Sequence, residues 1–403
     1  MIDEQIILNA EKSLNILFDK LEKTSLLNTE KVLNAFKKNK IALRHFNPTT
    51  GYGYDDEGRD TLNRVFADIF GSESAIVSPN IVSGTHAISL GLFSILYPGD
   101  TVLGITGLPY DTLQEVINGE NIGSLKDYNI KFDCISLNND KIDKDKIKEY
   151  FNTHKHPKMV MMQRSRGYEW RNALTISDIQ DSVNFLRGLG FDGVIYMDNC
   201  YGEFVEDKEP TDVGVNLVAG SMIKNVGGGI APTGGYLAGD SKLIDAVHRR
   251  LTAPSIGGEV GSYANTYQYF YQGLFLAPHV VKEALKGSLL VGAVLDKLGY
   301  ETSPSLSITP GDIIRAVKFN TENELISFIN NVQHFSPVDS FVDVYPWDMP
   351  GYEEQVIMAA GCFVQGASIE LSADAPIKEP YIAYMQGGLT YEHVKIMLKN
   401  LKL

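Results

Sequence analysis

Residues 158–199, KMVMMQRSRGYEWRNALTISDIQDSVNFLRGLGFDGVIYMDN, contain two short apolar runs on either side of a longer segment with helical spacing. The runs KMVMMQ (158–163) and GVIYMDN (193–199) are apolar up to their final polar residues, which is typical of strands buried on both faces. The segment TISDIQDSVNFLRGLG (175–190) predicts a helix. Strand, helix and strand in this order predict two parallel strands joined by a crossover helix.

The same alternation extends toward the N-terminus, without an internal repeat or a low-complexity tract. Strand and helix patterns follow one another from residue 61 onward. We expect helices at 61–70, 84–97, 110–117 and 141–151, and strands at 75–80, 100–106 and 130–137. The sequence therefore predicts an α/β fold with a mostly parallel sheet between helices.

The chain of 403 residues is longer than a usual single hydrophobic core. Residues 241–298 predict mostly helix, and residues 311–332 begin a new group of strand and helix. We therefore expect an N-terminal helical arm at 1–50, a large α/β domain at 51–290 and a small C-terminal α+β domain at 291–403.

The N-terminal arm contains two predicted helices and leads into an exposed loop. The helices cover residues 1–18 and the region near 27–40. The segment HFNPTTGYGYDDEGRD (45–60) is polar, aromatic and rich in glycine, so we expect a loop there.

Composition and charge exclude several classes of partner. The formal net charge of -14 disfavours nucleic acid and anionic membrane surfaces, so the expected ligand is a small molecule. No apolar run approaches the ~20 residues of a membrane span, and the acidic N-terminus does not resemble a signal peptide. The three cysteines form no Cys-x-x-Cys pair, which predicts a reduced, cytoplasmic protein without a metal site.

Ligands of open α/β sheets bind beyond the carboxyl ends of the strands, so polar residues that follow apolar runs are the site candidates. Ser83, Gly84 and Thr85 lie between a predicted strand and a helix, where free amides and the helix dipole favour an anion. An ordinary helix cap is the alternative. Tyr110 follows the next strand and is placed to stack on a flat ring, although a loop tyrosine in water is the commoner case.

Asp198 stands at the mouth of the apolar run GVIYM, where a buried acid needs a cationic or protonated partner. An N-cap or loop-anchoring role is the alternative. Cys200 beside it is interpreted as packing.

The block GSMIKNVGGGIAPTGGYLAG (220–239) contains a single lysine, Lys224, among small and apolar residues. A lysine in such surroundings can act as an amine nucleophile toward carbonyls, and the glycines at 227–229 let the backbone fold tightly beside a bound ring. A surface lysine before a glycine loop is the alternative. The block matches neither G-x-x-x-x-G-K-[ST] nor G-x-G-x-x-G, which disfavours a nucleotide site.

Taken together, these four groups supply an anion cup, a stacking ring, an acid for a pyridinium nitrogen and an imine-forming lysine. This set is typical of an enzyme that uses pyridoxal 5'-phosphate. Lys224 is then expected to bind the aldehyde of the cofactor.

Four motifs resemble one known family: MDNCYGEFVE (197–206), the 220–239 block, the 45–60 loop and YMQGGLTYEH (384–393). They resemble the bacterial aluminium-resistance or methionine gamma-lyase-related proteins, which are fold-type-I pyridoxal-phosphate enzymes distantly similar to the cystathionine lyases. The resemblance implies a homotetramer built from dimers, with active sites at the dimer interface.

The resemblance also implies roles for particular residues. Lys224 matches the cofactor-binding lysine, Asp198 the pyridinium partner and Tyr110 the ring-stacking aromatic, which is also the candidate to protonate the leaving sulfur. Ser221 matches a phosphate-binding serine beside Gly84 and Thr85. Tyr52 and Tyr54 stand where the cystathionine lyases have a Tyr-x-Arg pair that reaches the phosphate of the neighbouring subunit, and the arginine is absent here.

Other positions depart from the family pattern. Ile223 replaces a second hydroxyl residue before the lysine. Gln163, Arg164 and Arg166 replace the usual Asn-Pro strand end, and they are candidates for ring or substrate contacts, with a structural salt-bridge role as the alternative. Lys378 stands where an arginine for the substrate carboxylate is expected, and a lysine lacks the bidentate fork of a guanidinium.

The resemblance favours a carbon–sulfur lyase that acts on a sulfur-containing amino acid by the elimination of methionine gamma-lyase or cystathionine beta-lyase. The products are a thiol, ammonia and a 2-oxo acid. Transaminases, aldolases and cysteine desulfurases share the fold and the lysine, so these reactions stay open. A cofactor-binding sensor or resistance protein with little catalysis is a further alternative.

Overall fold

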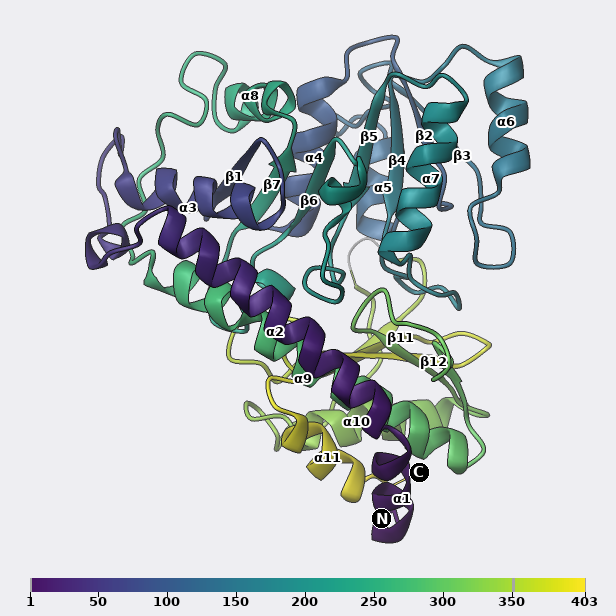
Figure 1. Cartoon of the computed structure of the whole chain (residues 1–403). Coiled ribbons are helices and arrows are strands. Elements are labelled where there is room, and N and C mark those ends of the chain that lie inside the picture. Colours follow the sequence, from purple (N-terminus) through teal and green to yellow (C-terminus); the bar gives the residue numbers. More distant parts are fainter. Residues whose placement is uncertain (1, 350–351, 403) are drawn as a thin grey trace.

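The computed structural model describes residues 2–349 and 352–402. Two sheets organise the chain, and helices cover the larger one on both faces (Figure 1). Within these residues no helix combines the length and the apolar character that a membrane crossing requires.

The large sheet has seven strands in the order β1-β7-β6-β5-β4-β2-β3. The run from β6 to β3 is parallel, whereas β7 is antiparallel to both of its neighbours. The strands are β1 (Ser74–Ser78), β2 (Thr101–Gly104), β3 (Lys131–Cys134), β4 (Met159–Gln163), β5 (Val194–Asp198), β6 (Leu217–Ser221) and β7 (Gly235–Gly239). The predicted mostly parallel sheet is confirmed.

Alternating side chains of the strands enter two separate hydrophobic layers. In β4, Met159 and Met161 belong to one layer, and Val160 and Met162 belong to the other. One face is covered by α4 (Gly84–Ile95), α5 (Asp111–Asn118) and α8 (Ser241–Arg250). The other is covered by α3 (Glu57–Ile69), α6 (Lys144–Thr153), α7 (Ile176–Gly188) and the long α9 (Gln268–Lys297). Burial on both faces explains why the strand sequences are continuously apolar.

The second sheet has five antiparallel strands in the order β10-β11-β12-β9-β8. They are β8 (Glu301–Ser303), β9 (Arg315–Lys318), β10 (Val356–Ala359), β11 (Ser372–Pro376) and β12 (Ile382–Gln386). Helices α10 (Glu322–His334) and α11 (Tyr391–Lys399) complete this part. The predicted boundary at residue 290 falls inside α9, which contacts both parts of the molecule, and the division into domains stays a prediction.

The N-terminal arm consists of α1 (Glu4–Ser13) and α2 (Asn15–Lys38). Helix α2 begins well before the predicted second helix at 27–40 and packs along α9, as Figure 1 shows in purple against green. The short helices η1 (Leu43–Phe46), η2 (Pro210–Val213) and η3 (Asn225–Gly227) lie in connections.

Two details differ from the sequence prediction. Helix α8 ends at Arg250 and α9 begins at Gln268, so residues 251–267 are irregular and not helical as expected. The predicted loop at 45–60 is shorter, because Asp56 caps α3 by accepting a hydrogen bond from the Arg59 amide at 3.0 Å.

Candidate active site

A cleft of about 690 Å³ lies at the carboxyl ends of the parallel strands. Tyr110, Gln163, Asp198 and Lys224 line it from the side of the large sheet, as expected for an open α/β sheet. Asp374 of β11 and nearby residues of the second sheet line the opposite side. The cleft therefore joins the two parts of the molecule.

Lys224 lies in the turn between β6 and η3 and borders the cleft. Its Nζ stands 4.0 Å from the centroid of the Tyr201 ring, a cation–π contact. Burial alone lowers the pKa of Lys224, but the acidic groups around it, Cys200, Tyr201 and Asp198, outweigh burial and hold the pKa above its usual value. No hydrogen-bond acceptor for Nζ is found in the described part of the chain.

The glycines after Lys224 do allow a tight fold, but against the protein itself and not beside the cleft. Gly228 has φ of 55°, and a Cβ there would lie 2.4 Å from the carbonyl oxygen of Gly273 in α9. None of the glycines at 227–229 lines the cleft. The expectation that they make room for a bound ring is therefore replaced by close packing of η3 on α9.

Asp198 is the last residue of β5 and lies in register with Gln163 of β4 and Ala219 of β6. Its Oδ1 accepts a hydrogen bond from the Cys200 amide at 3.1 Å. Burial raises the pKa of Asp198, and the nearby ammonium of Lys224 acts in the opposite direction. The two residues therefore lie within electrostatic reach of each other, as an acid and an amine in one cleft.

Tyr110 precedes α5 and is fixed by two hydrogen bonds. Its hydroxyl lies 2.9 Å from Thr85 Oγ1, and its amide donates to Gln163 Oε1 at 3.2 Å. Burial, and after it the charge of Asp198, raises the pKa of Tyr110, so the phenol stays protonated at neutral pH.

The predicted anion cup lies at the N-terminus of α4, directly beside Tyr110. Ser83 is an ordinary N-cap that accepts from the His86 amide at 3.0 Å. The amides of Gly84 and Thr85 are in the first turn and have no acceptor in the part of the chain that the structure covers. A Cβ built on Gly84 would lie 3.5 Å from Ser221 Cβ, so Ser221 and the helix terminus are neighbours. Capping and anion binding are compatible here.

Arg164 does not line the cleft, whereas Arg166 borders it but has one nitrogen of its guanidinium bound to Ser303 and two, Nε and Nη2, without a hydrogen-bond partner among the residues that the structure describes. The Arg164 side chain is fully buried and donates to Asn199 Oδ1, the Gly202 carbonyl and Glu206 Oε1 at 2.8–3.1 Å. Arg166 borders the cleft, but its buried guanidinium donates to Ser303 Oγ at 2.9 Å and lies 3.7 Å from Asp312. This geometry favours the structural alternative for both residues.

Lys378 is exposed at the rim of the cleft, and Gln163 is directly beside Tyr110. Tyr52 and Tyr54 are not brought to the cleft of their own chain. They are 70% and 60% exposed, and their rings lie 5.7 Å apart in the loop before α3.

Among the residues that border the cleft, several were not singled out by the sequence, and three of them carry functional groups that face the site. They are Tyr201, Tyr168 and Asp374. Tyr201 has φ of 70°, a rare value for a bulky residue, and its hydroxyl accepts from Ser368 at 2.9 Å. Burial raises the pKa of Asp374 to about 6. Tyr201 stands in the quoted motif MDNCYGEFVE, whereas Asp374 lies on β11 of the second sheet, far from that motif in the sequence.

The fold defines a class of protein: it is the fold of the type-I pyridoxal-phosphate enzymes. The pyridoxal-5'-phosphate-dependent protein YhfS of Escherichia coli shares the fold, with a TM-score of 0.63 over 95% of this chain and 96% of its own at 16% identity. The family model of methionine gamma-lyase matches residues 3–402, so the chain belongs to this family. The family resemblance seen in the sequence motifs is confirmed.

Several relatives are much more similar. A "carbon-sulfur lyase involved in aluminum resistance" from Clostridium novyi NT is 47% identical, with a TM-score of 0.94 over 98% of this chain and 93% of that one. A "putative cystathionine beta-lyase involved in aluminum resistance" from Listeria innocua is 48% identical, with a TM-score of 0.95 over all of both chains. The uncharacterized protein YnbB of Bacillus subtilis (strain 168) is 50% identical over 379 residues, which are 93% of this chain and 90% of YnbB.

Proposed function

We propose that this chain is a carbon–sulfur lyase that uses pyridoxal 5'-phosphate to eliminate a thiol from a sulfur-containing amino acid. The products are the thiol, ammonia and a 2-oxo acid, as in the reactions of methionine gamma-lyase or cystathionine beta-lyase. The observation that carries the proposal is the convergence of Lys224, Asp198 and Tyr110 on one cleft. The names of the relatives support the carbon–sulfur bond as the bond that is broken.

The residues present fit the cofactor. Lys224 offers an amine that has a ring face below it and no acceptor among the described residues, which suits a group that binds the amine covalently. Asp198 offers a buried carboxylate for a pyridinium nitrogen, and Tyr110 offers a ring face. Ser221 with the amides of Gly84 and Thr85 offers donors for a phosphate.

When bound, the cofactor supplies an electron sink that stabilises negative charge at the substrate Cα. Asp198 would hold the proton on the ring nitrogen. Lys224 Nζ would remove the proton from the substrate Cα. Tyr110 Oη would protonate the leaving sulfur, because burial keeps its phenol protonated.

Lys378 and Arg166 are the two candidates for binding the substrate, and we favour Lys378. Lys378 is exposed at the rim and lines the cleft, whereas the guanidinium of Arg166 is buried against Ser303 and Asp312. We propose that Lys378 attracts the substrate carboxylate as a point charge. Gln163 would support the ring-stacking Tyr110 through its side chain.

The assembly and location are also part of the proposal. We infer a homotetramer built from dimers in which exposed Tyr52 and Tyr54 serve the phosphate site of a neighbouring subunit. We propose a cytoplasmic location because Cys134, Cys200 and Cys362 are all free thiols.

The first test is the visible absorption spectrum of the purified protein with added cofactor, followed by borohydride reduction and peptide mass mapping. We expect a yellow protein whose reduced cofactor adduct maps to Lys224 and is absent from Lys224→Ala. A colourless protein that takes up no cofactor would contradict the proposal.

The second test is the release of 2-oxo acid from cystathionine, cysteine, homocysteine and methionine. Release from at least one of them, lost in Lys224→Ala, supports the lyase. If the cofactor binds at Lys224 but none of the four amino acids yields a 2-oxo acid, the result would instead support a transaminase, an aldolase or a cofactor-binding sensor.

A further inference from the structure

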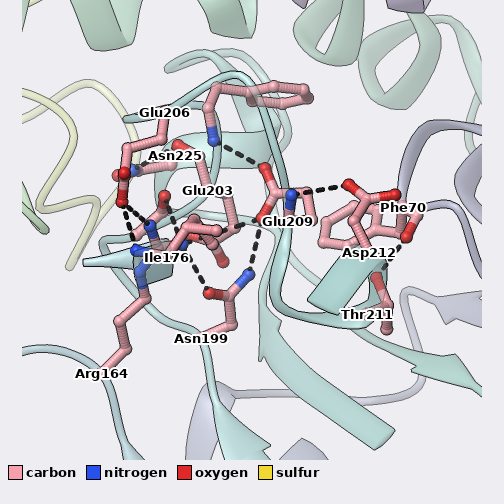
Figure 2. A network of polar contacts seen from close by, with 12 residues as sticks. Phe70, Arg164, Ile176, Asn199, Glu203, Glu206, Glu209, Thr211, Asp212 and Asn225 are labelled. Atoms are coloured by element: carbon pink, nitrogen blue, oxygen red, sulfur yellow. Dashed lines mark hydrogen bonds and ion pairs between the residues drawn. The ribbon is translucent and has the colours of Figure 1, made fainter. Parts of the chain in front are cut away.

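A buried polar network lies directly behind the candidate site (Figure 2). Each of three cleft residues is followed in sequence by a residue of the network: Gln163 by Arg164, Asp198 by Asn199 and Lys224 by Asn225. The first two pairs continue strands β4 and β5, and neighbouring side chains of an extended chain point to opposite sides, so one residue faces the cleft and the next faces the interior. In the third pair Asn225 begins η3, and its buried side chain donates to the Glu203 carbonyl. The network is therefore placed to hold the cleft residues in position.

The loop after β5 connects this network to Lys224 from two sides. Tyr201 places its ring under the ammonium of Lys224. Two residues later, the carbonyl oxygen of Glu203 accepts a hydrogen bond from Asn225 Nδ2 at 2.9 Å. Tyr201 and Phe204 both have positive φ, 70° and 61°, so the loop keeps an unfavourable backbone conformation to make these contacts.

Two glutamates of the network differ sharply in their partners. Glu209 accepts hydrogen bonds from the Phe204 amide at 2.9 Å and Asn199 Nδ2 at 3.1 Å, and it lies 3.8 Å from Arg164. Burial raises the pKa of Glu209, while the Arg164 guanidinium and these two donors act in the opposite direction and favour the carboxylate.

Glu203 is fully buried and has a single partner for its carboxyl group, the hydroxyl of Tyr236 at 2.8 Å from Oε1. Its Oε2 has no hydrogen-bond partner, and no ion pair of Glu203 exists within the described ranges. Asn225 Oδ1, in the residue that already binds the Glu203 carbonyl, is also buried without a donor. Protonation would remove the charge of a buried carboxyl that has no ion pair among the described residues, and it would supply a hydrogen-bond donor where Oε2 has no partner.

The backbone around Glu203 is shaped to admit this carboxyl. A Cβ built on Gly220 would lie 2.7 Å from Glu203 Oε1 and 2.5 Å from Tyr236 Cε1. Gly220 stands directly before Ser221 in the motif that carries Lys224. A glycine at this position is therefore required for the contact between Glu203 and Tyr236.

We propose that Glu203 is a positioning residue that works as a neutral carboxylic acid, holding Asn225 and with it the turn that carries Lys224. Its effect on the chemistry of Lys224 rests on the proposed function, whereas its protonation does not.

The electrostatic surroundings agree with this assignment. The titratable side chains that face Glu203 are Tyr236 of β7, Lys224, and Cys200 and Glu209 of the same loop. Burial is the main cause that raises the pKa of Glu203 to about 8, and Glu209 adds to it. Helix α3 contributes the apolar rings of Phe66 and Phe70 behind Tyr236.

The test compares thermal unfolding of the wild type and Glu203→Gln without cofactor between pH 5 and pH 9. The folded pKa lies above the ordinary value, so the stability that Glu203 contributes is fully present below the unfolded pKa and is lost as pH rises through the folded pKa. The glutamine side chain of Glu203→Gln does not ionise, so the variant does not lose stability in this way as the pH rises. We expect the Tm of Glu203→Gln minus that of the wild type to rise by about 2 °C or more across this range.

Glu209→Gln is the matched control, because it changes a glutamate of the same network that has a cationic partner. This variant should lose stability relative to the wild type, because Arg164 loses a buried partner. A Tm difference for Glu203→Gln that stays constant with pH, or that falls as pH rises, would overturn the proposal by showing that Glu203 folds as a carboxylate.

A second readout tests the positioning role in the enzyme with bound cofactor. We expect Asn225→Ala to lower kcat about tenfold or more with little change in KM, because the turn that carries Lys224 is misplaced. At alkaline pH, Glu203→Gln should retain more of its neutral-pH kcat than the wild type does, and Glu203→Ala should have a lower kcat than Glu203→Gln. If kcat falls equally at alkaline pH in the wild type and in Glu203→Gln, the positioning role of Glu203 is contradicted. The unfolding experiment stays informative even if no lyase activity is found.

Discussion

At the scale of single residues, the cleft is an arrangement of three groups with different protonation states. Lys224 is held as an ammonium by the acids around it, while Tyr110 is kept as a phenol by burial. Asp198 is buried but stands near the positive charge of Lys224. Tyr110 and Asp198 are therefore in forms that suit their proposed roles, whereas Lys224 must lose its proton, as it does when it binds a carbonyl covalently, before it can act as a base.

Replacing Asp198 by asparagine should lower kcat about 100-fold or more while the cofactor still binds. The amide keeps the size of the side chain but carries no charge to hold a proton on the ring nitrogen. Steady-state kinetics together with the absorption spectrum checks this. Asp133→Asn is the control, because Asp133 lies on the edge strand β3 and does not line the cleft. Similar kcat values for the two variants would contradict the role of Asp198.

Replacing Tyr110 by phenylalanine should separate two steps of the proposed reaction. The ring face stays, so exchange of the substrate α-proton with solvent should continue. Release of the thiol should fall about 100-fold, because the leaving sulfur loses its acid. Deuterium exchange in D₂O and a thiol assay on the same samples measure the two steps. Equal losses in both would argue against Tyr110 as the acid.

At the scale of secondary-structure elements, the turn with Lys224 depends on helix α9. Helix α9 contacts η3 on one side and the arm helix α2 on another (Figure 1). The contact between η3 and α9 is backbone to backbone, at Gly228 and Gly273. The position of Lys224 is therefore set by an element far away in the sequence.

Gly228→Ala should lower the stability of the fold by about 2–4 kcal/mol. The new methyl group meets the Gly273 carbonyl, and φ of 55° disfavours any residue with a Cβ. Thermal or urea unfolding measures the change. Gly188→Ala at the end of α7 is the control: its Cβ would meet nothing within 4 Å, so we expect no loss. Equal stability of the two variants would show that the packing of η3 on α9 is not tight.

At the scale of the whole molecule, the position of Tyr52 and Tyr54 concerns the assembly. Both side chains are exposed and distant from the cleft lining of their own chain. Suppose that they complete the site of a neighbouring subunit. An assembly that mixes subunits with a substituted Lys224 and subunits with a substituted Tyr54 then contains some sites in which both residues are intact.

Mixing Lys224→Ala subunits with Tyr54→Ala subunits should therefore restore about a quarter of the wild-type activity. The two variants are unfolded and refolded together, and 2-oxo acid release is measured beside the separate variants. No recovery in mixed assemblies, with correct size by light scattering, would contradict a role of Tyr54 in the site of a neighbouring subunit, and full activity of Tyr54→Ala alone would place Tyr54 outside the site. The same scattering measurement tests the proposed tetramer.

Much of the fold could be predicted from local sequence patterns. Strands β1, β2, β4 and β5 lie in apolar runs that the sequence marks, since burial on both faces favours such a composition. Strand β3 was also predicted although it is partly exposed, and β6 and β7 were not predicted. The irregular segment 251–267 was mistaken for helix, and the full length of α2 was not recognised, because packing on α9 rather than local pattern extends that helix.

The candidate site was only partly predictable. Lys224, Asp198 and Tyr110 stand at strand ends that the sequence marks, and they lie around one cleft. Arg164 and Arg166 also follow a strand end, but one face of that segment turns into the interior, which the sequence does not show. Asp374 was missed because its place depends on the second sheet.

The sequence by itself determined the α/β class, the family and the residues at the strand ends, because these depend on local periodicity and on short motifs. Only the tertiary structure decided which of two adjacent side chains faces the cleft and which glutamate is paired with a cation. Those outcomes depend on contacts between segments far apart in the chain, such as Asn225 with Glu203 and Gly228 with Gly273. Burial and the neighbouring charges, and not residue type alone, then shift the pKa of each group.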